Sequence, residues 1–219
     1  MKSTASDLEA ITEGIRARFV SKNVAREQAL PVCREAIRHS ANAIRAVHRG
    51  EFEVAQELKD RAGSLVRQAR EALREHPDIF HAGFVHDAQK EFAEASLTLA
   101  LVADRPLPAP EDLGVEHAAY LNGLGETVGE LRRHLLDSLR SGDVDHCEGL
   151  LTSMDDIYSV LVTFDYPDAM TAGLRRTTDA VRGILERTRT TVDGCSPARA
   201  CWVGSSRLQP SRTSSSSPR

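Results

Sequence analysis

Apolar residues recur at spacings of three and four along almost the whole chain up to Val192. This is the period of an amphipathic helix, because 3.6 residues make one helical turn. Two such series stand near the N-terminus: Leu8, Ile11, Ile15 and Phe19, followed by Cys33, Ile37, Ser40, Ile44 and Val47. No segment shows the sustained alternation of β-branched residues that is typical of a strand. The pattern therefore predicts an all-α protein.

Prolines and glycines divide this pattern into separate helices. Pro31 should kink or interrupt a long first helix that ends at Arg49-Gly50, and the second helix stops near His76-Pro77. Further helices are expected over roughly residues 84–103, 113–139, 147–161 and 170–185. In the last of these, we expect Met170 and Leu174 to face inward. The result is a bundle of six or seven long helices joined by short loops.

The charge and cysteine content exclude several classes of protein. The chain has a formal net charge of −4 and lacks an uncharged apolar run of ~18 residues, so we expect no membrane span. Its first residues have no apolar segment of the secretory type, and its four cysteines form no CxxC pair. We therefore expect a soluble, cytoplasmic protein with reduced thiols. Its acidic body also lacks the uniformly basic surface of a dedicated duplex binder.

The composition changes near the C-terminus. Residues 193–219 contain four arginines, one acidic residue and a run of four serines. Such a segment cannot bury a core, so we expect residues 1–192 to form one helical domain and residues 193–219 a disordered basic tail. A basic tail could hold nucleic acid, but the composition favours an unstructured appendage.

Two acidic pairs stand out because each lies on a segment that is otherwise free of charge. In residues 92–103 the sole charged residue is Glu94, and Glu91 precedes it by three residues on the same helix face. A helix that is apolar nearly all round is a buried helix. A carboxylate on such a helix must be paired, neutralised or bound to a metal.

The second pair, Glu126 and Glu130, holds the only charges of its segment and also shares one helix face. The same segment contains Gly123, Gly125 and Gly129, each of which disfavours helix by ~1 kcal/mol relative to alanine. We expect these glycines to allow the close approach of another helix or of a ligand backbone.

The two pairs together suggest one acidic cluster. Four converging glutamates repel one another unless a divalent cation neutralises them, and ligation by oxygen alone favours Mg²⁺ or Mn²⁺. Such a site suits hydrolysis of a phosphodiester, because the metal activates water and shields the charge that develops on phosphate. The alternative is that the glutamates pair with Arg132, Arg133 or Arg175 across the bundle.

Several motifs in this chain resemble the translin/Trax family. They are Gln89-Lys-Glu91-Phe-Ala-Glu94-Ala, the run from Tyr120 to Arg133, Met154-Asp-Asp-Ile-Tyr158, Asp165-Tyr-Pro-Asp168 and Leu174-Arg-Arg. The similarity covers roughly residues 34–189. It implies a translin-like helical subunit that assembles into an oligomeric shell, an octamer in the family, around single-stranded RNA or DNA.

The resemblance also implies a catalytic site. Subunits of the Trax type carry a metal-dependent endoribonuclease centre of four carboxylates. Glu91 and Glu94 match its Glu-x-x-Glu pair, while Glu126 and Glu130 match its acid-x-x-x-Glu pair. Glu126 stands where Trax usually has aspartate. The resemblance thus implies that these four residues are the catalytic residues and the ligands of Mg²⁺ or Mn²⁺.

A shell that encloses RNA needs positive charge on its inner face to meet phosphate. The candidate RNA-binding residues are Arg38, Arg45, His48 and Arg49 on the first helix, and Arg67, Arg70, Arg74 and His76 on the second. The alternative is a solvated face on which Glu71 and Glu75 balance these arginines. His81 and His86 could contact phosphate or assist proton transfer, or be ordinary surface histidines.

Functions from different classes remain open at this point. The first is a metal-dependent endoribonuclease that cleaves single-stranded RNA inside a homo-oligomeric shell, or in one shared with a paralogous subunit. The second is a non-catalytic shell that binds RNA or DNA, in which the glutamates are structural. A third is a scaffold subunit that binds no nucleic acid.

Overall fold

Every element in the described part of the chain is a helix. The computed structural model describes residues 4–142 and 144–195. Six helices are long: α1 (Thr4–His48), α2 (Phe52–Ala72), α4 (Gly83–Val102), α6 (His117–Ser141), α7 (Val144–Leu161) and α9 (Leu174–Cys195). Three are single turns: α3 (Pro77–Phe80), α5 (Pro110–Leu113) and α8 (Asp168–Thr171). None of these helices is long and apolar enough to cross a membrane.

The prediction of an all-α bundle with six or seven long helices is confirmed. The predicted tail begins at residue 193, whereas α9 continues to Cys195. The rest of that tail, residues 196–219, lies outside the described residues.

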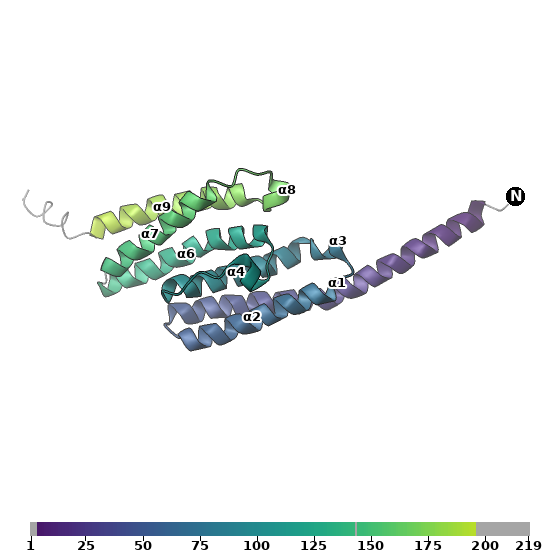
Figure 1. Ribbon diagram of the computed structural model, residues 1–219, viewed down its shortest axis with the longest axis horizontal. Coiled ribbons are helices and arrows are strands. Elements are labelled where there is room, and N and C mark those ends of the chain that lie inside the picture. Colours follow the sequence, from purple (N-terminus) through teal and green to yellow (C-terminus); the bar gives the residue numbers. More distant parts are fainter. Residues whose placement is uncertain (1–3, 143, 196–219) are drawn as a thin grey trace, which may run out of the picture.

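The helices stack in layers, with α4 near the centre (Figure 1). α1 and α2 pair along one side of α4, α6 packs on its other side, and α7 and α9 cover the far side of α6. Every residue of α4 from Phe92 to Ala100 is consequently buried. This confirms that the apolar segment around Glu94 forms a buried helix.

Pro31 does not interrupt α1, so of the predicted kink or interruption the interruption is wrong. The helix runs from Thr4 to His48 with Pro31 inside it. A proline in a helix interior removes one backbone hydrogen bond and crowds the preceding turn, at a cost of ~3 kcal/mol or more. Pro31 itself is exposed, while Ala29 and Cys33 are buried in an apolar cluster with residues of α2 and α4. The packing of this buried face offsets the cost of the proline.

The first part of α1 projects away from the other helices as an arm, residues 4–20 (Figure 1). Four large apolar side chains of the arm, here called the arm stripe, are at least half exposed: Leu8 (57%), Ile11 (60%), Ile15 (50%) and Phe19 (67%). Ile11 and Ile15 lie five helical turns before Ala29 and Cys33, so they share the helix face of those buried residues. The buried face of α1 therefore continues into the arm as an apolar surface.

Residues with positive φ stand at several of the helix ends. Gly50 has φ of 74° and follows α1, as predicted for the Arg49-Gly50 end. Ala172 and Gly173 have φ of 51° and 83°, so the last long helix begins only at Leu174. Met170 therefore falls in the single turn α8 and is 67% exposed, and the prediction that it faces inward is wrong. Leu174 is buried as predicted.

Candidate metal centre

Gly123 sets the distance between α4 and α6, the two helices that carry the acidic pairs. A Cβ atom on Gly123 would lie 2.7 Å from the carbonyl oxygen of Lys90 and 3.0 Å from the backbone nitrogen of Glu94. Backbone atoms cannot yield as a flexible side chain does, so glycine is required for the helices to pack at this point. The expected close approach of another helix is confirmed for Gly123.

The other two glycines of this segment differ from each other. Gly125 faces the side chain of Thr177 on α9, so it also serves the packing of helices. A Cβ atom on Gly129 would meet no atom of the described residues within 4 Å. Within this part of the chain, the expected close approach is therefore absent at Gly129.

Three carboxylates converge where α4 and α6 cross. Glu91, Glu94 and Glu126 each offer one oxygen, and these oxygens all lie within 4.8 Å of one another. Glu94 is buried, with 8% of its surface exposed, while Glu91 and Glu126 are half-buried. A set of carboxylate oxygens at this spacing fits a hard divalent cation such as Mg²⁺ or Mn²⁺. The structure thus brings three of the four predicted ligands together.

Burial and mutual repulsion disfavour the ionised forms of the carboxylates in this cluster. Burial raises the pKa of Glu94 to about 8, and the charges of Glu91, Glu126 and Glu130 add to this rise. Burial likewise raises the pKa of Glu91. A cation in the cluster would favour the ionised forms, since an opposite charge stabilises a carboxylate.

Lys90 lies beside the cluster and partly neutralises it. Its Nζ is 2.7 Å from Oε1 of Glu126 and 3.8 Å from Oε1 of Glu91. Burial lowers the pKa of Lys90, but the hydrogen bond and the charge of Glu126 outweigh that effect and raise it. Sequence reasoning missed this residue, although it directly precedes Glu91 at the start of the apolar segment.

The arginines considered as alternative partners contribute little. Nη1 of Arg133 is 4.0 Å from Oε2 of Glu130, one turn along the same helix. Among the described residues, neither Arg132 nor Arg175 forms an ion pair with the four glutamates.

Glu130 has a different partner, His48. Nε2 of His48 lies 2.5 Å from Oε2 of Glu130, and the imidazole N–H donates because a carboxylate can only accept. This hydrogen bond lowers the pKa of Glu130. The His48 side chain is only 5% exposed, since it follows Ile44 by one turn on the buried face of α1. His48 therefore faces the acidic site, and its predicted place on an RNA-binding surface needs correction.

A groove opens beside the cluster, between α6 and α9. It has a volume of about 440 Å³ and is lined by Glu94, Gly125, Glu126, Arg176, Thr177, Ala180, Val181 and Ile184. Arg176 is exposed and places a guanidinium at the same groove as two of the carboxylates. Sequence reasoning missed Arg176, although the Leu174-Arg-Arg motif contains it.

The six arginines predicted to bind RNA are exposed, and each contacts a partner among the described residues. Arg38 contacts Glu35, Arg45 contacts Asn42, Arg49 contacts Glu51, and Arg74 contacts Glu71. Arg70 reaches Gly114 and Glu116, and its guanidinium lies over the ring of Phe80. The pairing of Arg74 with Glu71 matches the alternative of a balanced, solvated face.

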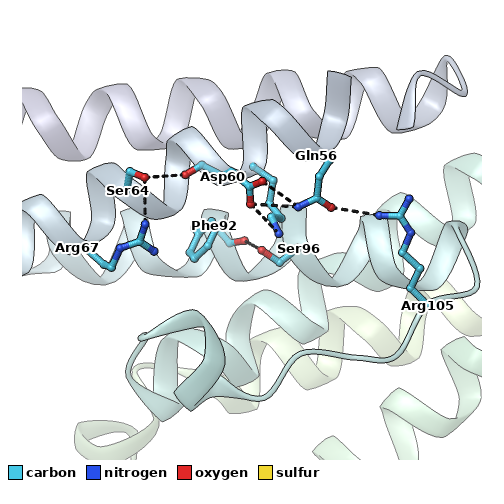
Figure 2. A network of polar contacts seen from close by, with 8 residues as sticks. Gln56, Asp60, Ser64, Arg67, Phe92, Ser96 and Arg105 are labelled. Carbon is cyan, nitrogen blue, oxygen red and sulfur yellow. Dashed lines mark hydrogen bonds and ion pairs between the residues drawn. The ribbon is translucent and has the colours of Figure 1, made fainter. Parts of the chain in front are cut away.

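Figure 2 shows the surroundings of Arg67. Its guanidinium donates to the hydroxyl of Ser64 at 3.0 Å, and that hydroxyl donates to the backbone oxygen of Asp60. The amide of Gln56 donates to the Asp60 carboxylate and accepts a hydrogen bond from Arg105. The contact between Arg105 and Gln56 connects the loop after α4 to α2. The contact with Ser64 holds the guanidinium of Arg67 against the same helix.

The predicted histidines occupy different positions. His76 is half-buried at the start of α3, with Nε2 3.4 Å from Oγ of Ser21. His81 is exposed. Burial lowers the pKa of His86, and the charges of Lys90 and Glu126 also act on this residue. Of the two histidines before the first acidic pair, His86 is therefore the one close to the cluster.

The helical layers and the carboxylate cluster define an all-α protein with a candidate metal centre between two core helices. Comparison with known proteins identifies its family. The chain is 30% identical over 173 residues to the uncharacterized protein MJ0175 of Methanocaldococcus jannaschii, which covers 78% of this chain and 76% of that protein. No family model matches the chain.

Solved structures give the family its name. The chain is 35% identical to AfC3PO in its complex with duplex RNA, with a TM-score of 0.79 over 86% of this chain and 98% of that one. A second structure of AfC3PO matches equally, with a TM-score of 0.78. Apo-NeC3PO, at 19% identity and a TM-score of 0.72 over 90% of this chain and 99% of that one, shows the shared fold. The chain belongs to the translin/Trax family, and the resemblance in its motifs is confirmed.

Proposed function

We propose that this protein is a metal-dependent endoribonuclease of the translin/Trax type. The observation that carries the proposal is the convergence of Glu91, Glu94 and Glu126, whose oxygens lie within 4.8 Å of one another beside a groove. The complex of the 35% identical AfC3PO with duplex RNA supports RNA as the substrate. Buried carboxylates of this kind are costly to a fold, which favours a functional reason for the cluster.

The donor set fits Mg²⁺ or Mn²⁺, because all the converging atoms are carboxylate oxygens. Glu91, Glu94 and Glu126 would hold the ion. A divalent cation at such a site supplies Lewis-acid activation of a phosphate oxygen and of water. Glu94, whose pKa burial raises to about 8, would give up its proton as the ion binds.

The chain's own cations would position the RNA. Arg176 lines the groove with Glu94 and Glu126, so its guanidinium would contact a phosphate next to the one that is cut. The exposed arginines of α1 and α2 would hold the backbone further away. The sequence predicts single-stranded RNA as the substrate, and the AfC3PO complex contains duplex RNA, so both forms are used in the test below.

The proposal includes assembly with further copies of this chain. The arm stripe continues the buried face of α1, and no part of the described chain covers it. Contiguous apolar side chains left exposed in this way mark protein interfaces. A second copy is the occupant that fits best, because the fold is that of C3PO, an oligomeric helical shell.

A non-catalytic RNA-binding shell is the second candidate. The contact between Lys90 and Glu126 favours it, because an ammonium already neutralises part of the cluster without a metal. In that case the glutamates and Lys90 would be a structural ion-pair network.

The test is incubation of the full chain with fluorescent RNA, single-stranded and duplex, in Mg²⁺, in Mn²⁺ or in EDTA. We expect cleavage only with metal, and a double variant Glu126→Gln, Glu130→Gln that binds RNA but does not cut it. The matched control is Glu13→Gln, an exposed glutamate of the arm, which should cut normally. Unchanged cleavage by the double variant would overturn the assignment, and RNA binding without cleavage by the wild type would decide for the shell.

A further inference from the structure

The four glutamates of the acidic site fall into two groups by their contacts. Glu91, Glu94 and Glu126 offer oxygens within 4.8 Å of one another, and no oxygen of Glu130 belongs to that set. Glu130 nevertheless lies one turn after Glu126 on α6, and its negative charge adds to the rise in the pKa values of Glu91 and Glu94. Glu130 thus stands beside the three converging carboxylates and outside their set.

His48 is the hydrogen-bond partner of Glu130. Its Nε2 is 2.5 Å from Oε2 of Glu130, across 82 residues of sequence and between α1 and α6. The His48 side chain is 5% exposed, whereas that of Glu130 is 26% exposed. The histidine is therefore the fixed partner, enclosed by the core, and the glutamate is the partner that reaches toward solvent.

The ion pairs of Glu130 with described residues involve only one of its two carboxylate oxygens. Both His48 and Arg133 contact Oε2, at 2.5 and 4.0 Å. Oε1 takes part in neither contact. Within the described residues, Nδ1 of His48 is buried without a hydrogen-bond partner, so the ring is held through Nε2 alone. This hydrogen bond from the imidazole holds the Glu130 carboxylate in one orientation, as outer partners of functional carboxylates do.

We propose that His48 is a positioning residue that holds Glu130 outside the three metal ligands, so that Oε1 of Glu130 orients the attacking water and accepts its proton. The inference rests on the proposed hydrolysis of RNA. In that step the water oxygen forms a bond to phosphorus and the bond from phosphorus to the leaving ribose oxygen breaks. One proton of the water passes to Glu130, and the leaving oxygen takes a proton from solvent.

The division of roles can be tested by metal binding in the absence of RNA. Mn²⁺ is titrated into the full chain by calorimetry for the wild type, Glu94→Gln, Glu130→Gln, His48→Ala and His48→Gln. We expect Glu94→Gln to lose Mn²⁺ binding, and the variants at positions 130 and 48 to bind within about 3-fold of the wild type, since they leave all three ligands in place. A loss at Glu130→Gln as large as at Glu94→Gln would overturn the inference, because Glu130 would then be a ligand.

The positioning role is tested on RNA cleavage by the same variants. We expect kcat to fall ~10²-fold or more for Glu130→Gln and ~10-fold or more for His48→Ala, with KM little changed. His48→Gln should recover part of kcat, because its amide N–H can reach the same oxygen. His39→Gln is the matched control, since His39 lies on the same helix and pairs with Glu35, and it should leave kcat unchanged.

Thermal melting of each variant separates positioning from folding. If His48→Ala unfolds, His48→Gln and Glu130→Gln still decide the question. Wild-type kcat in a folded His48→Ala would overturn the role of His48. A wild type that binds Mn²⁺ but never cuts RNA would overturn the proposed function instead, and the Mn²⁺ titration of Glu130→Gln would still show whether Glu130 is a ligand.

Discussion

Gly123 on α6 lies against the backbone of α4 beside Lys90, and this contact brings the two acidic pairs together. We predict that Gly123→Ala destabilises the protein by ~1–3 kcal/mol, because a Cβ would stand 2.7 Å from the Lys90 carbonyl oxygen. Mn²⁺ affinity should fall as well, since the helices must separate. Gly129→Ala is the control, and it should gain up to ~1 kcal/mol, because its Cβ meets open space in the described chain. Urea unfolding and Mn²⁺ titration check both variants, and equal effects of the two would contradict this account of the helix contact.

The buried Glu94 should make the metal-free protein less stable as the pH rises. Its folded pKa is about 8, above the ordinary value of 4.5, so the folded state binds the proton more tightly than the unfolded state. The stability from this group is complete below pH 4.5 and is lost as the pH approaches 8, at ~1.4 kcal/mol per pH unit.

Glu94→Gln removes this dependence. We therefore expect the free energy of unfolding of Glu94→Gln, relative to the wild type, to rise steadily from pH 5 to pH 8 in EDTA. Urea unfolding at several pH values measures it, with Glu13→Gln as an exposed control whose difference from the wild type stays constant. A constant difference for Glu94→Gln would show that Glu94 is not buried as the structure has it.

Lys90 should compete with the metal for Glu126. Its ammonium is 2.7 Å from the carboxylate, and a divalent cation at the cluster would be repelled by it. We predict that Lys90→Met tightens Mn²⁺ binding on the order of 10-fold. Lys59→Met is a matched control, because Lys59 is equally half-buried and pairs with Asp60 on α2. Weaker Mn²⁺ binding by Lys90→Met would mean that Lys90 organises the carboxylates instead.

The arm stripe should hold copies of this chain together. We predict that Ile15→Glu lowers the molar mass measured by light scattering, because it places a charge in the middle of the apolar surface. Ala17→Glu adds the same charge on the opposite side of the arm and should leave the mass unchanged. Helix content by circular dichroism should be the same for both. An unchanged mass for Ile15→Glu would remove the arm from the interface.

Sequence periodicity was sufficient for the helices but not for their tertiary context. The Arg49-Gly50 end was predictable, because glycine adopts the positive φ that stops a helix. An interruption at Pro31 was one predicted outcome and is wrong, since the burial of Ala29 and Cys33 against other helices is not visible from local propensity. Met170 was misplaced because nothing in the apolar spacing shows that Ala172 and Gly173 break the helix.

The sequence predicted the carboxylates of the acidic site but not their partners. Glu94 and Glu126 stood out because charges on otherwise uncharged helix segments are costly once the helix is buried. The partners of these glutamates come from tertiary packing. His48 reaches Glu130 from α1, and Arg176 reaches the groove from α9, so their roles depend on which helices are neighbours.

The central claim is that the acidic cluster is a metal site that cleaves RNA. Its most direct test is a Mn²⁺ titration in which metal binding and cleavage of labelled RNA are followed in the same samples. We predict that cleavage rises over the Mn²⁺ range in which the ion binds, and that Glu94→Gln loses both while Glu13→Gln keeps both. Cleavage that persists in EDTA, or a wild type that binds Mn²⁺ and RNA yet leaves the RNA intact, would contradict the claim.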